Sequence, residues 1–206
     1  MGTSYNDQAA DDVAAFITAL GAGPAHLVGW SLGSTVAHMT VFKHADKVRS
    51  AYLLEGMLPL ALTDEQKKQS RQSPGRRWRA PSPRCRHGDM PAMVRAQYDD
   101  HNVGEAGAFD KQPEAVREMQ LRFAPLAVDI FKNMPKKPLI CADNRALRVP
   151  AVLVRGTGTS PTVKESLSDR YWKDCVPTMD VPGATHYFPR IVAEFSQSGA
   201  QFAVKH

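Results

Sequence analysis

Apolar residues near the start of the chain first recur at helical spacing and then form a short continuous run. The helical spacing predicts an amphipathic helix that Asn6 or Asp7 caps, because their side-chain oxygens accept bonds from free N–H groups, and that Gly21 ends. The run at 25–28, bounded by proline and glycine, predicts a buried strand. The helix positions expected to face the core are Val13, Phe16, Ile17 and Leu20.

Helical and strand-like segments alternate through the rest of the chain, on both sides of a long insertion. Parallel strands need crossover connections, and helices commonly supply them. The pattern therefore predicts an α/β fold in which a parallel sheet is flanked by helices. In chain order the expected elements are a helix at 33–44, strands at 50–54 and 149–156, a helix at 162–172, a strand at 178–181 and a closing helix at 191–202. In the 33–44 helix, the residues available for burial are Val36, Ala37, Val41 and Phe42.

The insertion between the second and third strands differs in character from the rest. We expect a core made of residues 1–62 and 138–206, and a cap-like helical insertion at 63–137. Within it, residues 71–88 are rich in Arg, Pro and Ser and show no apolar period, which is typical of an exposed or disordered loop. Helical turns are expected at 64–70, and longer helices at 91–99 and 113–133.

Length and composition favour a single globular domain. The chain has 206 residues, and 43% of them are hydrophobic, enough for a real core. No apolar run approaches the ~20 residues that a membrane span needs, and the N-terminus does not resemble a signal peptide. The three cysteines are odd in number and lack metal-ligand spacing. We therefore expect a cytoplasmic protein with no membrane association, metal or organic cofactor.

The positive charge of the chain is local. The net charge is +5, but eight Lys and Arg residues and no acid lie between residues 66 and 88, and the remainder is slightly acidic. Such a segment could serve as a nucleic-acid-binding arm. Its single aromatic residue, Trp78, and the lack of a recognisable binding module make that the least favoured interpretation, so we expect no nucleic-acid partner.

A G-x-S-x-G motif runs from Gly29 to Gly33 and lies where the first strand meets the second helix. A turn this tight needs glycine at both ends, because a Cβ atom there would clash, and it leaves Ser31 strained with its hydroxyl exposed. The helix N-terminus adds positive dipole, and the N–H of Leu32 is the natural first donor to an oxyanion. The alternative is that Ser31 occupies an ordinary turn.

Three segments resemble parts of the α/β-hydrolase superfamily, in its esterase and lactonase-like branch. Residues 25–34 resemble the nucleophile elbow, 149–156 the penultimate strand, and 181–186 the loop that carries the histidine. They occur in the family's order, and the resemblance covers about residues 5–61 and 148–202. It implies that the insertion is the family's variable cap.

A serine hydroxyl needs an imidazole within reach to take its proton. Of seven histidines, His186 alone follows a strand through a Pro-Gly-Ala turn, so we expect it to be the base; the alternative is a surface-loop histidine. Many relatives carry an Asp after the penultimate strand, but 156–161 contains no carboxylate. Glu55, at the end of the 50–54 strand, is the best substitute or else a solvated strand-end residue. Asp143 and Asp169 are weaker candidates.

The resemblance also implies that something is missing. The family's first four strands, and the loop that usually gives the second oxyanion donor, have no counterpart before residue 5. We expect the 25–28 strand to expose a sheet edge through which copies could associate. A fragment, a missed upstream start codon and a degraded gene are all consistent with this pattern.

Two functions therefore stay open. The first is a serine hydrolase acting on a small ester, lactone or related carbonyl substrate, with Ser31, His186 and Glu55 in the catalytic roles and Leu32 N–H at the oxyanion. The second is a truncated, catalytically silent homologue that serves as a scaffold. The shape of the cap determines the substrate, and the sequence does not indicate that shape.

Overall fold

The computed structural model describes residues 5–56, 90–101, 107–132, 147–159, 176–186 and 193–206. Its elements, in chain order, are α1 (Tyr5–Leu20), β1 (Ala25–Trp30), α2 (Leu32–Lys43), the short 3₁₀ helix η1 (Ala45–Lys47), β2 (Val48–Leu54), α5 (Met90–His101), α6 (Glu114–Lys132), β3 (Ala151–Gly156), β4 (Thr178–Val181) and α10 (Ala193–Lys205).

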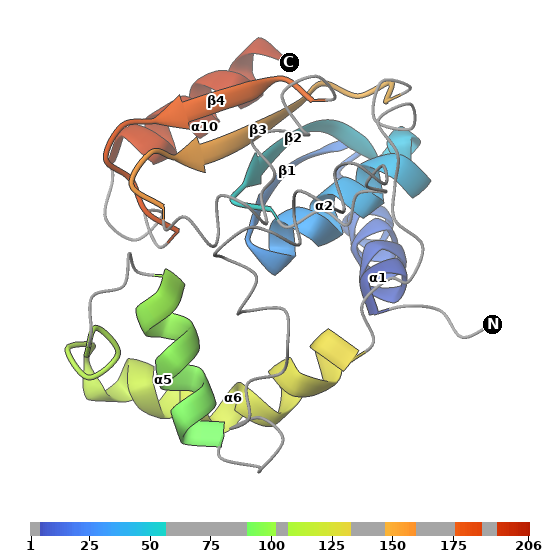
Figure 1. Cartoon of the computed structure of the whole chain (residues 1–206). Coiled ribbons are helices and arrows are strands. Elements are labelled where there is room, and N and C mark those ends of the chain that lie inside the picture. Colours follow the sequence, from blue (N-terminus) through green and yellow to red (C-terminus); the bar gives the residue numbers. More distant parts are fainter. Residues whose placement is uncertain (1–4, 57–89, 102–106, 133–146, 160–175, 187–192) are drawn as a thin grey trace, which may run out of the picture.

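The four described strands form one parallel sheet in the order β1-β2-β3-β4. Helices α1 and α2 lie on one face of this sheet and α10 on the other (Figure 1). The register pairs Trp30 with Leu54, and Leu54 in turn with Val154, so the carboxyl ends of β1, β2 and β3 meet at one edge. The predicted fold class, a parallel sheet flanked by helices, is confirmed.

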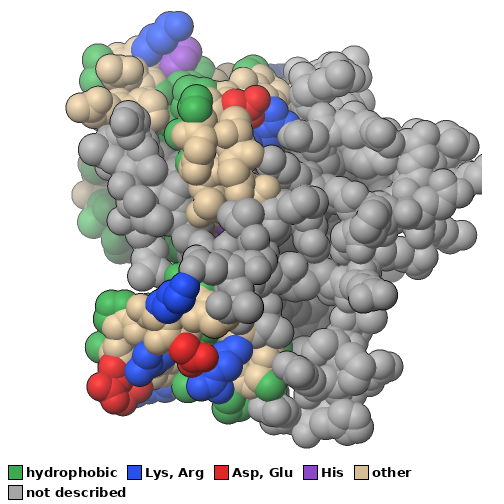
Figure 2. Space-filling view, turned by 60° about the vertical axis from the view of Figure 1, so that its left-hand side comes forward, with side chains coloured by type: hydrophobic (Ala, Val, Ile, Leu, Met, Phe, Trp, Pro, Cys, Tyr) green, Lys and Arg blue, Asp and Glu red, His purple; other side chains and the backbone are tan. Residues whose placement is uncertain are grey.

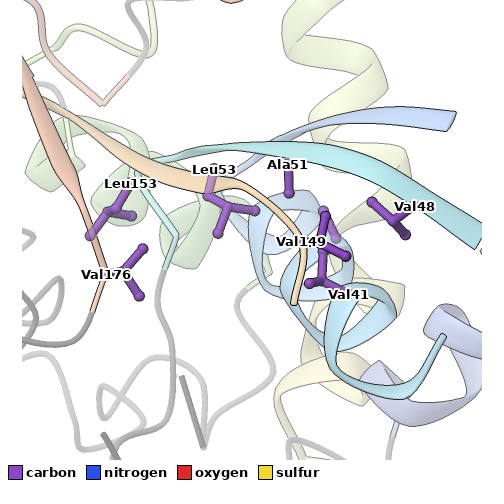
Figure 3. Close-up of a cluster of buried hydrophobic side chains, with 8 residues drawn as sticks. Val41, Val48, Ala51, Leu53, Val149, Leu153 and Val176 are labelled. Carbon is purple, nitrogen blue, oxygen red and sulfur yellow. The ribbon is translucent and has the colours of Figure 1, made fainter. Parts of the chain in front are cut away.

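The main core lies between the sheet and α2. The side chains of Ala51, Leu53 and Leu153 are fully buried and belong to one cluster with Val41 of α2 (Figure 3). Cutting a buried leucine such as Leu53 back to alanine typically costs about 2–5 kcal/mol. A second cluster on the opposite face packs α10 against the sheet, where the Tyr52 hydroxyl also bonds Ser198 at 2.7 Å.

Two details of α1 differ from the expectation. The helix begins at Tyr5, so Asn6 and Asp7 lie inside its first turn and do not cap it. Its buried face consists of Asn6, Ala10, Ala14 and Ile17, while Phe16 and Leu20 are exposed. Small alanines let α1 approach α2 closely, so the buried stripe is narrower than the apolar residues alone suggest. In α2, likewise, Ala37 and Val41 are buried but Phe42 is exposed.

Charged side chains join α1 to α2 at the surface. The Asp11 carboxylate accepts bonds from Lys43 Nζ and His44 Nε2, both at 2.7 Å. These two partners hold the pKa of Asp11 below its ordinary value of 3.8, the Lys43 bond contributing most. The packing of the two helices therefore has an electrostatic component that depends on pH.

Strand β1 is the outermost strand of the described sheet. It pairs with β2 along its whole length. On its other side no described strand lies beside it, and the Val28 side chain is 60% exposed. The edge predicted for residues 25–28 is therefore present in the described sheet. Association of copies through it stays a prediction.

The insertion between β2 and β3 contributes α5 and α6, which pack together around Tyr98 and Phe109. Side chains of both signs are intermixed on this helical pair (Figure 2), and Arg95 forms an ion pair with Asp110 at 3.2 Å. The predicted helices at 91–99 and 113–133 match these two elements closely.

Several predictions fall outside the described residues. These are the basic segment 71–88, the helical turns at 64–70 and the helix at 162–172. The boundaries near residues 62 and 138 also fall in undescribed ranges, so the division into core and cap stays a prediction. Among the helices that the structure does describe, none combines the length and apolar character needed to cross a membrane.

Candidate active site

Ser31 lies between the last residue of β1 and the first residue of α2, with φ 54° and ψ −119°. A positive φ is costly for a residue with a side chain, and such strain persists only where the surroundings enforce it. One constraint is the bond from Ser31 N–H to the Leu54 carbonyl at 2.8 Å, which continues the sheet ladder past the end of β1. The serine is therefore fixed to the neighbouring strand.

The two glycines of the motif have unequal roles. A Cβ atom on Gly29 would lie only 2.3 Å from the Gly33 carbonyl oxygen, so no other residue fits there. A Cβ atom on Gly33 would meet nothing within 4 Å. The expectation that both glycines avoid a clash is therefore wrong for Gly33. The close approach is between the backbone of Gly33 and the face of β1. Only the strand residue, Gly29, must therefore lack a side chain.

The imidazole of His186 lies against the serine. Its Nε2 is 3.1 Å from Ser31 Oγ, and the side chain is almost fully buried. His186 follows β4 through a turn at Pro182, Gly183 and Ala184. Gly183 has φ +72°, a conformation that favours glycine, so the turn itself requires this residue.

The other ring nitrogen of His186 faces Glu55. Nδ1 is 3.3 Å from Glu55 Oε2, and the carboxyl is fully buried. Its second oxygen, Oε1, accepts the N–H of Gly156 at 2.5 Å and the hydroxyl of Thr159 at 3.1 Å. Glu55 follows β2 directly and has φ 47°, the second non-glycine residue with positive φ in the described chain. A buried carboxylate with three partners is oriented, not solvated.

The backbone N–H groups nearest to Ser31 lie in the first turn of α2. The N–H groups of Ser34 and Thr35 bond the Ser31 carbonyl. Leu32 and Gly33 are the first two residues of α2, and N–H groups at the start of a helix have no partner within the helix itself. Leu32 N–H therefore lies beside Ser31 at the positive end of the helix dipole.

Three other described histidines lie in β1, in α2 and at the residue that ends α2. His26 contacts the Ser50 hydroxyl at 2.8 Å in the strand pair, His44 bonds Asp11, and His38 is buried within α2. The weaker acid candidates Asp143 and Asp169 lie outside the described residues. Of the residues singled out from the sequence, the structure thus brings together Ser31, His186, Glu55 and Leu32.

Two residues at the site were not predicted from the sequence. Thr159 bonds the carboxyl of Glu55, and the indole N–H of Trp30 bonds the His186 carbonyl oxygen at 2.7 Å. Thr159 lies in the loop after β3, a segment that contains no carboxylate but does contain hydroxyl groups. Trp30 occupies the variable position of the motif. The available signal was a polar group in each: a hydroxyl at a strand end and an indole donor beside the serine.

The alpha/beta hydrolase family model matches residues 1–198 of the chain. The chain belongs to this family. By sequence, no curated protein matches it. Several solved α/β-hydrolase structures share its fold.

The enol-lactonase from Burkholderia xenovorans superposes with a TM-score of 0.60 at 16% identity, covering 97% of this chain and 73% of the lactonase. The naproxen esterase from Bacillus subtilis gives a TM-score of 0.58 at 14% identity, covering 97% of this chain and 66% of the esterase. A bromoperoxidase from Bacillus anthracis gives a TM-score of 0.60 at 13% identity, covering 94% and 72%. At these identities the likeness shows the α/β-hydrolase fold alone.

Proposed function

We propose that this α/β hydrolase is a serine hydrolase that cleaves a small ester, lactone or related carbonyl substrate. One observation carries the proposal: Ser31 Oγ, both ring nitrogens of His186 and Glu55 Oε2 form a chain with separations of 3.1 and 3.3 Å. A nucleophile, a base and a group that orients the base are the parts that acyl transfer requires. The names of the lactonase and esterase neighbours agree with this class of substrate.

In the proposed reaction, Ser31 Oγ attacks the substrate carbonyl while His186 Nε2 accepts the hydroxyl proton. Glu55 stabilises the resulting imidazolium through Nδ1–H and keeps the ring in the tautomer that leaves Nε2 free. Leu32 N–H donates to the oxyanion. Collapse of the tetrahedral intermediate breaks the C–O bond, and His186 returns the proton to the leaving alkoxide. Water then hydrolyses the acyl-serine by the same steps.

We expect the reaction to be slow unless a second oxyanion donor joins Leu32 N–H. Removal of one such donor typically lowers kcat by about 10²–10³. The alternative function, a catalytically silent scaffold, would keep the same fold with no acyl transfer. The two alternatives differ in whether the Ser31 hydroxyl reacts.

The test is labelling of the purified chain by a fluorophosphonate probe, together with hydrolysis of a short-chain aryl ester. We expect Ser31→Ala and His186→Ala to abolish both signals. His26→Ala, a histidine on the same sheet but outside the site, serves as the matched control and should retain them. Equal signals from the wild type and the Ser31→Ala and His186→Ala variants would mean that hydrolysis is background, and the silent scaffold would then be the correct function.

A further inference from the structure

We infer that Trp30 is a positioning residue: its indole N–H fixes the backbone of His186 and thereby sets the imidazole against Ser31. This inference rests on the proposed function. Trp30 is the last residue of β1 and is covalently next to Ser31. Its Nε1 donates to the His186 carbonyl oxygen at 2.7 Å, across 156 positions of sequence. One hydrogen bond therefore connects the residue beside the nucleophile to the residue that carries the base.

The geometry separates this role from simple packing. The rings of Trp30 and His186 lie 5.8 Å apart at 42°, so the indole borders the imidazole without stacking on it. The apolar part of Trp30 packs instead against the cluster of Tyr52, Leu54 and Val154. The ring thus packs against the sheet cluster, and its N–H donates to the backbone of the histidine loop.

The same loop is held from its other end by the segment that follows β3. Gly158 N–H bonds the Ala184 carbonyl at 2.8 Å, and Gly183 N–H bonds Thr157 Oγ1 at 2.8 Å. Both contacts lie on the N-terminal side of His186. The Trp30 bond is on its carbonyl side, so the two sets of contacts hold the residue from both directions.

The arrangement sets the distance that matters for proton transfer. Ser31 is bonded to β2 through Leu54, and Glu55 follows Leu54 directly. Nucleophile and acid are therefore both fixed to the strand pair β1–β2, whereas His186 comes from the loop after β4 on the far side of β3. Trp30 joins that loop to β1 directly. A displacement of about 1 Å at a reacting group can lower a rate by about 10²-fold, so losing this link should reduce turnover more than binding.

The variant that tests this role is Trp30→Phe, which keeps an aromatic ring in the cluster but removes the donor. Tyr52→Phe is the matched control, because it removes another 2.7 Å bond from the same cluster, to Ser198, away from His186. Aryl-ester kinetics and urea unfolding are measured for both. We expect Trp30→Phe to lower kcat about 10-fold or more with KM changed less than two-fold, and Tyr52→Phe to leave both constants near wild type at a similar unfolding midpoint.

Unchanged kcat in Trp30→Phe, or a rise in KM alone, would overturn the inference while leaving the proposed function intact, provided that Ser31→Ala is inactive. Where the wild type itself shows no Ser31-dependent activity, the proposed function fails, and the imidazole signals decide the inference. In ¹⁵N-histidine spectra, with His186 assigned from His186→Ala, we expect Trp30→Phe to broaden or split the His186 ring signals. Ring signals as sharp as in Tyr52→Phe would show that the indole does not hold the histidine.

Discussion

Replacing Glu55 by glutamine tests the proposed triad most directly, because the structure dictates which way the new amide must face. Oε1 of Glu55 accepts two donors, the Gly156 N–H and the Thr159 hydroxyl. In Glu55→Gln the amide oxygen keeps that position, since an NH₂ group there would meet both donors. The NH₂ group then replaces Oε2, 3.3 Å from His186 Nδ1.

Two effects on the rate follow. The amide donates to Nδ1, so the ring proton moves to Nε2, and Nε2 can no longer accept the Ser31 proton. The charge that stabilises the imidazolium is also lost. At 3.3 Å that attraction is worth ~5 kcal/mol with an effective dielectric constant of 20, or between 10³ and 10⁴ in rate. We therefore expect kcat/KM to fall by about 10³–10⁴ with the fold intact.

The assay is aryl-ester hydrolysis and fluorophosphonate labelling, with circular dichroism to monitor folding. Asp180→Asn is the matched control: it makes the same carboxyl-to-amide change at a surface ion pair with Arg155 on the same sheet, and it should keep full activity. A Glu55→Gln variant that folds and retains activity within about ten-fold of wild type would refute the reasoning, since replacing an acid that orients His186 must lower kcat/KM by far more.

Three further outcomes are expected. Gly29→Ala should lower the free energy of unfolding by about 1–3 kcal/mol or prevent folding, because its Cβ atom would meet the Gly33 backbone. Gly33→Ala should fold and raise the free energy of unfolding by up to about 1 kcal/mol, and urea unfolding distinguishes the two variants. Thr159→Val should lower kcat about 10-fold with KM unchanged, since the carboxylate of Glu55 keeps only one of its two anchoring donors. Thr159→Ser should restore kcat and Thr159→Ala should not; the reverse result would contradict this role. Asp11→Asn should lower the unfolding midpoint near neutral pH and have no effect at strongly acidic pH. Lys43 holds the pKa of folded Asp11 below its ordinary value of 3.8. The stabilisation of the fold by Asp11 is therefore present above pH 3.8 and disappears as the pH falls through the lower folded pKa. A variant difference that persists in acid would show that the Asp11 bonds act through packing.

Much of the fold could be predicted from the sequence, because its strongest signals are local. The run at 25–28, the glycine at position 29 and the helix that follows are contiguous, so their physical meaning can be determined without knowing the rest of the chain. The helix surface could not be predicted as well. Phe16 and Leu20 are apolar yet exposed, since the buried side of α1 is decided by the small residues that let α2 approach.

The candidate site shows the same division. Ser31 and His186 each follow a strand through a recognisable turn, so their positions could be inferred one at a time. For the acid, the sequence made Glu55 only the best of several candidates, because the choice depends on which loop reaches the histidine. Glu55 is 131 residues from His186, and its two anchoring donors come from the loop after β3. Nothing in the local sequence around Thr159 or Trp30 records the residue that each one bonds.

Because β1 lies at the edge of the described sheet, the thermal stability of the site can differ from that of the fold. In the described sheet, β1 has β2 on one side only, and this strand carries the serine. Edge strands open in sub-global fluctuations that leave the interior strands paired. Each such opening breaks the Ser31–Leu54 bond, and it also breaks the bond by which Trp30 of the same strand holds the His186 carbonyl. For the proposed serine hydrolase we therefore expect, on warming, that activity is lost at a lower temperature than the one at which the core unfolds.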